Sequence, residues 1–119
     1  MGDEYTCIWD FRVRPERQAA FETDYGPDGT WASLFRRAEG YLGTTLLRDR
    51  ADPLRYVTVD RWQSIEAYQA FRARFSREYD ELDRACAGLT SQETALGEFT
   101  ARRPEIRQAS TAGTPTTQD

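Results

Sequence analysis

Residues 41–68 read YLGTTLLRDRADPLRYVTVDRWQSIEAY, and this stretch decides the fold. Residues 41–49 and 55–62 are rich in β-branched and aromatic side chains, and a short loop containing Pro53 lies between them. Two such runs joined by a short loop are typical of a β-hairpin. Ser64 then stands where it can cap a helix, with Glu66 in the first turn near the positive end of the helix dipole. The stretch therefore predicts strand, strand and helix in that order.

The chain before this hairpin predicts a strand and two short helices. Every odd position from Tyr5 to Val13 is apolar, and Ile8 is the only apolar residue at the positions between them. Such alternation is typical of a strand with one buried face. Pro15 suits the first position of a helix that ends within residues 25–29, where two glycines and a proline occur. Apolar residues at helical spacing in residues 31–38 predict a second helix that ends at Gly40.

The chain after the hairpin predicts a long helix, a last strand and a tail. Apolar side chains recur at helical spacing from Ile65 to Leu89, which predicts one helix closed by Gly88. Residues 90–100 predict a strand. From residue 101 the chain has hardly any apolar side chains, too few for burial to offset the entropy lost on ordering. We expect one folded domain at residues 1–100 and a disordered tail at residues 101–119.

The predicted order β-α-β-β-α-β is that of the ferredoxin-like plait, an α+β fold in which helices cover one face of an antiparallel sheet. Residues 55–62 carry apolar side chains on both faces of their strand. Val57 and Val59 lie on one face, whereas Tyr56 and Trp62 lie on the other. The sheet therefore has an apolar face that its own helices do not cover.

Residues 41–49 also have two apolar faces. Simple alternation places Tyr41 and Leu47 on one face and Leu42 and Leu46 on the other. Because an exposed apolar face of this size needs a cover, we expect a second copy of the sheet to pack on it about a two-fold axis. The predicted assembly is a homodimer.

Composition and charge exclude several classes of function. Among 119 residues there are 16 basic ones, all arginine, 20 acidic ones and no histidine, for a net charge of -4. Histidine bases, histidine-ligated metals or haem, and lysine Schiff bases are therefore excluded. The acidic balance is unlike that of a nucleic-acid-binding protein, and no apolar run is long enough to span a membrane. Residues 1–4 do not read as a signal peptide, and Cys7 and Cys86 read as reduced thiols, so we expect a cytoplasmic location.

The acidic run at residues 78–83 has two interpretations. Its carboxylates could bind a metal ion, but arginines stand four residues from several of them. Opposite charges at that spacing are typical of a solvated helix face. We therefore expect no metal site.

Three motifs, at residues 41–49, 56–62 and 64–68, resemble the antibiotic biosynthesis monooxygenase family of dimeric α+β barrels. The resemblance covers about residues 5–99 and implies that family's fold. Members that make quinones from aromatic polyketides use neither metal nor flavin, so the resemblance implies a cofactor-free enzyme here. Haem-degrading relatives need a histidine near Phe71 and Arg72, and its absence excludes that branch.

The resemblance also implies site residues. The family's tryptophan at the end of the third strand matches Trp62, and its tyrosine in the next helix matches Tyr68. Its asparagine four residues before the tryptophan is Thr58 here, which puts the reaction type in doubt. Its arginine has no clean match, although Arg72 and two later arginines, Arg77 and Arg84, stand nearby.

We expect a pocket between sheet and helices that suits a flat aromatic ligand. The expected catalytic residues are Tyr68, Asp60 and Trp62, and the expected substrate-binding residues are Trp9, Trp31, Thr58, Phe71, Arg72 and Phe75. Asp60 or Asp10 could be the general base, with a pKa raised in a dry site. Each of these residues also has a purely structural interpretation. Either aspartate could form an ion pair with Arg12, Arg48 or Arg61, Thr58 could simply favour the strand, and the aromatic residues could belong to the core.

The predicted function is that of a cofactor-independent monooxygenase of secondary metabolism, which oxidises an aromatic or polyketide-like molecule with O2. Two alternatives stay open. One is a dimer that binds a small molecule without catalysis, and the other is a non-oxidative cyclase or isomerase that uses the same pocket. The expected partners are the small molecule and a second copy of the chain, with neither nucleic acid nor membrane.

Overall fold

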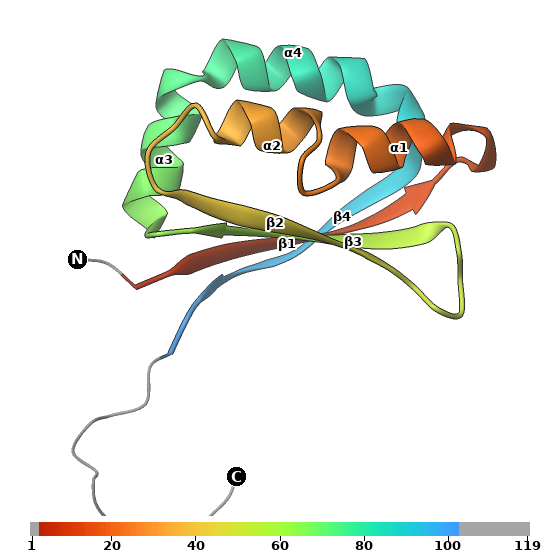
Figure 1. Ribbon diagram of the computed structural model, residues 1–119, viewed down its shortest axis with the longest axis horizontal. Coiled ribbons are helices and arrows are strands. Elements are labelled where there is room, and N and C mark those ends of the chain that lie inside the picture. Colours follow the sequence, from red (N-terminus) through yellow and green to blue (C-terminus); the bar gives the residue numbers. More distant parts are fainter. Residues whose placement is uncertain (1–2, 103–119) are drawn as a thin grey trace, which may run out of the picture.

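The computed structural model describes residues 3–102, which form one antiparallel sheet with strand order β2-β3-β1-β4. The helices all lie on one side of this sheet (Figure 1). The elements are β1 (Tyr5–Val13), a short 3-10 turn (Pro15–Arg17), α1 (Gln18–Tyr25), α2 (Thr30–Phe35), β2 (Tyr41–Arg48), β3 (Arg55–Trp62), α3 (Ile65–Arg74), α4 (Ser76–Cys86), a second 3-10 turn (Ala87–Leu89) and β4 (Thr90–Thr100). The ferredoxin-like α+β fold is thus confirmed. The tail expected from residue 101 lies almost wholly outside the described residues.

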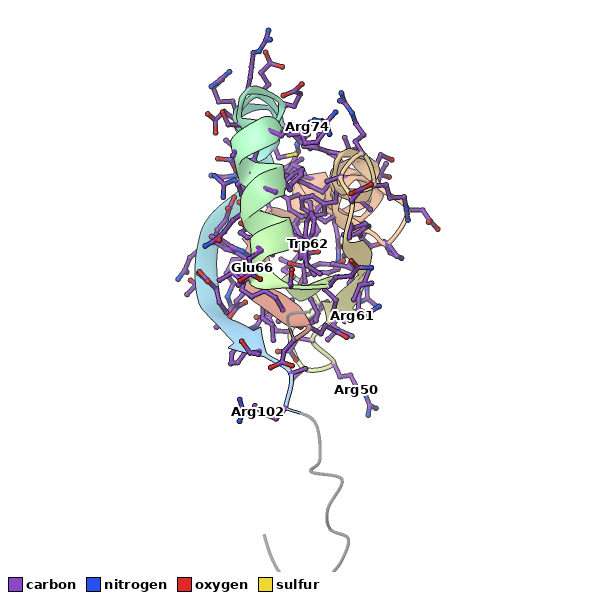
Figure 2. All side chains as sticks on the ribbon, turned by 90° about the vertical axis from the view of Figure 1, so that its left-hand side faces the viewer. Arg50, Arg61, Trp62, Glu66, Arg74 and Arg102 are labelled. Carbon is purple, nitrogen blue, oxygen red and sulfur yellow. The ribbon has the colours of Figure 1, made fainter. Side chains whose placement is uncertain are left out.

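The core lies between the sheet and the helices and is largely aromatic. On β1 the alternation holds as predicted, with Tyr5, Cys7, Phe11 and Val13 buried against the helices. Trp62 of β3 is completely buried, and Figure 2 shows it in the interior while the labelled charged side chains lie outside. The remaining buried aromatic residues come from α1, α2, β3 and α3 or the residue that ends it: Phe21, Tyr25, Trp31, Phe35, Tyr56, Phe71 and Phe75. Their rings meet at centroid distances of 4.3 to 6.0 Å, which holds the helices on the sheet.

The long helix expected at residues 65–89 is two helices. Phe75 leaves the helical conformation (φ -110°, ψ 28°), and α4 begins at the next residue in a new direction, across α2 (Figure 1). Phe75 itself is buried, with its ring 5.6 Å from that of Phe71. The bend lets the apolar stripe follow the core, because a straight helix would carry its second half away from it.

β2 departs from simple alternation, and the predicted faces of its leucines are wrong in part. Tyr41 pairs with Trp62, whereas Gly43 pairs with Arg61, so Leu42 is an extra residue in the strand. This β-bulge shifts the alternation by one residue. As a result Leu46 packs against the core together with Tyr41, and Leu47 is exposed on the open face.

None of the helices in residues 3–102 is long and apolar enough to cross a membrane.

Candidate functional site

A cavity of about 160 Å³ lies between the sheet and α2 and α4. It brings together four of the residues predicted from the sequence: Trp9 of β1, Trp31 of α2, and Thr58 and Asp60 of β3. The other lining residues are Phe11, Tyr25, Phe35, Thr44, Tyr79, Asp83 and Glu93. Every strand and three of the helices thus contribute to one site.

The walls of the cavity are aromatic. Tyr79 of α4 meets Trp31 edge-on at 5.0 Å between ring centroids, and Trp31 lies 5.8 Å from Phe35 and 6.0 Å from Tyr25. On the sheet side Trp9 stacks with Phe11 at 6.3 Å. Walls of this kind favour a flat aromatic ligand.

Asp60 is the polar centre of the cavity. It occupies the same face of β3 as Trp62, because the two are separated by one residue in a regular strand. The Thr44 hydroxyl donates a hydrogen bond of 2.6 Å to Oδ1 of Asp60. Burial raises the pKa of Asp60 from 3.8 to about 6, although the hydrogen bond from Thr44 lowers it. Such a carboxyl group is ionised at neutral pH and is a much stronger base than an exposed aspartate.

The ion pair considered for Asp60 does not occur among the described residues. Arg61 pairs instead with Glu4 at 3.7 Å, and Arg12 pairs with Asp52. The carboxylate of Asp60 therefore faces the cavity without a neutralising cation within salt-bridge distance in residues 3–102.

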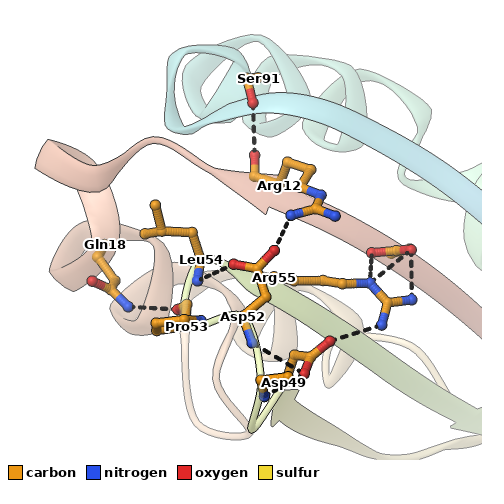
Figure 3. A network of polar contacts seen from close by, with 10 residues as sticks. Arg12, Gln18, Asp49, Asp52, Pro53, Leu54, Arg55 and Ser91 are labelled. Carbon is orange, nitrogen blue, oxygen red and sulfur yellow. Dashed lines mark hydrogen bonds and ion pairs between the residues drawn. The ribbon is translucent and has the colours of Figure 1, made fainter.

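Asp10, the other aspartate considered as a base, lies on the opposite face of the sheet. It sits in a network of polar contacts at the β2–β3 loop, where Arg55 donates to it at 2.9 Å and to Asp49 at 3.1 Å (Figure 3). Asp49 also accepts the backbone N–H of Ala51 at 2.7 Å, which fixes the loop. Asp10 thus stabilises the hairpin and does not line the cavity.

Trp62, Phe71 and Phe75 lie in the core beside the cavity and are not among its lining residues. The Trp62 ring meets Tyr41 at 5.3 Å and Tyr68 at 5.5 Å. Its indole Nε1 is buried and has no hydrogen-bond partner within residues 3–102. A buried donor left unpaired is costly, so it is a candidate for a functional contact.

Tyr68 and Arg72 form a pair one helical turn apart on α3. Arg72 Nη1 donates to the Tyr68 hydroxyl at 3.1 Å, and its guanidinium lies 3.8 Å from the centre of the Tyr79 ring. Burial raises the pKa of Tyr68, although the Arg72 contact opposes the shift, and burial raises the pKa of Tyr79 to about 12. Neither residue of the pair lines the cavity, but Arg72 contacts Tyr79, which does.

The lining residues missed by sequence reasoning had weak signals. Tyr79 was counted as part of the apolar stripe of a helix, and Thr44 reads as an ordinary strand residue. Asp83 belongs to the acidic run interpreted as a solvated helix face, and both Asp83 and Glu93 are exposed where they line the cavity. Within residues 3–102 no group of three or more cysteine and acidic side chains is placed to hold a metal ion.

Comparisons with known proteins give one consistent family and fold. The family model for antibiotic biosynthesis monooxygenases matches residues 5–81. A variant of SnoaB, a cofactor-independent oxygenase from Streptomyces nogalater, is 26% identical and superposes with a TM-score of 0.67, covering 87% of this chain and 97% of that one. A comparison with curated protein sequences found no match.

Two further solved structures share the fold at lower identity. A Bordetella bronchiseptica protein described as an antibiotic biosynthesis monooxygenase is 23% identical, with a TM-score of 0.65 over 85% of this chain and 99% of that one. A Nitrosomonas europaea protein described in the same words is 17% identical, with a TM-score of 0.66 over 87% and 95% of the two chains.

Proposed function

The chain belongs to the antibiotic biosynthesis monooxygenase family, and from this premise we propose that it oxidises an aromatic substrate with O2 and without a cofactor. The observation that carries the proposal is Asp60, a carboxylate with a raised pKa in an aromatic cavity. The likeness to SnoaB, described as a cofactor-independent oxygenase, supports the reaction class.

The proposed reaction needs few groups from the protein. Asp60 takes a proton from an acidic C–H or O–H group of an electron-rich ring system such as an anthrone. The resulting anion gives an electron to O2, the two radicals combine, and Asp60 returns its proton to form a hydroperoxide. Asp60 then takes the second proton from the same carbon, the O–O bond breaks and a carbonyl forms. The departing hydroxide receives that proton, so one methylene and one O2 give one carbonyl and one water.

The protein supplies a base, a dry site and hydrogen bonds to the anion. A pKa of about 6 suits a base that works at neutral pH, because the group is mostly ionised there yet binds a proton well. Thr58 lies two residues before Asp60 on the same face and lines the same cavity, so its hydroxyl can contact an oxygen of the substrate.

Trp62, Tyr68, Arg72, Phe71 and Phe75 enter the proposal as residues that shape and position the site. Trp62 carries a buried donor that has no partner in residues 3–102, and Arg72, bonded to Tyr68, packs on the ring of Tyr79, which lines the cavity. Trp9 and Trp31 are the proposed walls on which the substrate stacks.

The size of the cavity limits how the substrate binds. A protein cavity of roughly 150 Å³ holds one benzene-sized molecule, so 160 Å³ takes the reacting ring of a larger substrate and little more. The remaining rings would lie towards Asp83 and Glu93, which are exposed where they line the cavity.

Oxygen consumption tests the proposal. Purified protein with an anthrone should consume O2 and form the anthraquinone well above the protein-free rate. Asp60→Asn should lower kcat/KM by about 10²-fold or more, the usual worth of a positioned base. Asp80→Asn, which changes an exposed acid on α4 outside the cavity, is the matched control and should keep full activity.

Turnover that persists without O2 would instead support a cyclase or isomerase. Binding of the anthrone without any turnover would support a non-catalytic binding protein.

The proposal includes a homodimer in a reducing cytoplasm. The face of the sheet opposite the helices carries apolar side chains, and Leu47 and Phe99 are each 49% exposed. A second copy of the sheet would cover them. Both cysteines, Cys7 and Cys86, are free and buried, as expected in a compartment that keeps thiols reduced.

A further inference from the structure

The bulge on β2 places two hydroxyl groups beside Asp60. In a regular strand, residues three apart face opposite sides of the sheet. Because Leu42 is the extra residue, Tyr41 pairs with Trp62 and Thr44 pairs with Asp60, and these two residues of β3 share the face that points at the helices. Tyr41 and Thr44 are therefore brought to the same face by the bulge alone.

The hydroxyl groups form a chain with a defined direction. Tyr41 and Thr44 lie 2.6 Å apart at their hydroxyl oxygens, and Thr44 donates to Oδ1 of Asp60 at 2.6 Å. A threonine hydroxyl has only one proton to donate, so Tyr41 must be the donor to Thr44. No other side-chain hydrogen bond to Asp60 is formed within residues 3–102, which leaves its Oδ2 for a substrate.

We propose that Tyr41 and Thr44 are positioning residues, a hydroxyl relay that aims the Asp60 carboxylate into the cavity and sets the pH at which it becomes a base. The relay deepens the proposed function and depends on it only for its catalytic consequence. Chains of hydrogen bonds polarise one another, so the Tyr41 donor strengthens the bond from Thr44 to the carboxylate.

Gly43 makes this arrangement possible. Its φ of +154° is a conformation that other residues rarely adopt, and a Cβ there would lie 3.2 Å from a guanidinium nitrogen of Arg61. Bulges beside active sites commonly re-aim a side chain, and here Thr44, the next residue, is the one that reaches Asp60.

The ionisable groups around Asp60 come from six elements. They are Cys7 of β1, Tyr25 of α1, Tyr41 of β2, Arg72 of α3 over the Tyr79 ring, Tyr79 and Asp83 of α4, and Glu93 of β4. Arg36 and Arg61 act on Tyr41 and so on the outer end of the relay. Because the chain has no histidine, no imidazole titrates in the pH range of Asp60.

The experiment follows the carboxyl carbon of Asp60 by NMR against pH in the substrate-free protein. The native chain should show a midpoint near 6. Thr44→Val keeps the shape but removes the donor, and it should move the midpoint up by about one pH unit. Thr44→Ser should restore the native midpoint, and Tyr41→Phe should give a smaller upward shift than Thr44→Val. Thr45→Val, in the same strand but on the open face, should change nothing.

An unchanged Asp60 midpoint in Thr44→Val would overturn the relay, and so would a shift of equal size in Thr45→Val. The titration needs no substrate, so it separates the two proposals. If the midpoint moves as expected but the native protein does not consume O2 with an anthrone, the relay stands and the proposed function fails. If the native protein consumes O2 and the midpoint does not move, the function stands and the relay fails.

Discussion

Ionised Asp60 lowers the stability of the fold at neutral pH, where it would act as a base. Its carboxyl group receives one hydrogen bond, from Thr44, and no ion pair within residues 3–102, so ionisation in this cavity is disfavoured. A pKa raised by about two units corresponds to at most about 3 kcal/mol between the protonated and ionised forms. Active sites often carry such a cost, because the same desolvation makes the group a better base.

The first prediction concerns stability and pH in Asp60→Asn. Because the folded-state pKa of Asp60 is raised, its protonated form stabilises the fold fully below pH 3.8, and that contribution is lost as pH rises through about 6. The side chain of Asp60→Asn does not ionise, so the variant should be more stable than the native protein at pH 8 by about 1–3 kcal/mol. The gap should close by pH 4. Urea denaturation at the two pH values measures it, and an equal gap at both would contradict the raised pKa.

The second prediction concerns Tyr68. Its hydroxyl bonds to Arg72, and neither Tyr68 nor Arg72 is among the residues that line the cavity. Tyr68→Phe should therefore lower kcat for anthrone oxidation by less than about tenfold, far less than Asp60→Asn. The pH at which kcat/KM reaches half its maximum should stay unchanged. Steady-state kinetics across pH 5–8 would decide, and a loss as large as that of Asp60→Asn would make Tyr68 a catalytic residue.

At the scale of single elements, regular sequence patterns predicted the strands and helices, but the bulge in β2 and the break between α3 and α4 were not predicted. Alternation predicted β1, because this strand buries one face against the helices, whereas β3 was predicted by its content of β-branched and aromatic residues. The bulge at Leu42 was not predicted, although an isolated glycine inside a strand, here Gly43, is a signal of a bulge. The break between α3 and α4 at Phe75 contains no glycine or proline, the residues that usually mark the end of a helix in a sequence. The Phe75 ring is buried at the break instead.

The same limits applied to the site. Trp9, Trp31 and Asp60 could be predicted because aromatic residues and a mid-strand carboxylate are recognisable in sequence, and Thr58 because it matches the family's asparagine position. Thr44 could not, because its contact with Asp60 depends on the shifted register of β2.

The third prediction tests the bulge through Gly43. Gly43→Ala forces a side chain into a positive φ and against Arg61, so it should destabilise the protein by about 1–3 kcal/mol. Gly88→Ala is the matched control, because a Cβ there meets nothing within 4 Å. Its free energy of unfolding should be equal to or above that of the native chain. Equal stabilities of the two variants in urea would contradict the strain at Gly43.

The fourth prediction concerns the start of α3. The Ser64 side chain accepts the backbone N–H of Ala67 at 3.1 Å and so caps the helix. Ser64→Ala should cost about 1 kcal/mol, the usual worth of a serine cap. Ser76→Ala removes an exposed serine at the first position of α4, where no side-chain cap exists, and should change stability by less than about 0.5 kcal/mol. Thermal denaturation of both variants distinguishes a true cap from a general serine effect.

At the scale of the whole molecule, the sheet has one covered face and one open face. The helices cover the first, whereas the second combines a polar network around Asp10 and Arg55 (Figure 3) with exposed apolar side chains on the two edge strands. Register places Leu47 beside Val57 and Phe99 beside Thr6 on this open face. The Phe99 ring lies over Gly97, within 2.9 Å of where a Cβ would be, so it forms a flat apolar surface that a second sheet could contact.

The last prediction concerns the assembly through that surface. Leu47 and Phe99 are each 49% exposed, and burying such a side chain stabilises an interface by about 1–3 kcal/mol. A glutamate at either position would bury an unpaired charge instead, so Leu47→Glu or Phe99→Glu should raise the Kd of the dimer at least about 100-fold. Ile65→Glu is the matched control, because Ile65 is 38% exposed but lies at the start of α3 and away from the open face.

Sedimentation equilibrium should then show a dimer for the native chain and for Ile65→Glu, and a monomer at micromolar concentration for the two sheet variants. A native chain that sediments as a monomer would refute the homodimer. Dissociation by Ile65→Glu alone would move the interface from the sheet to the helices.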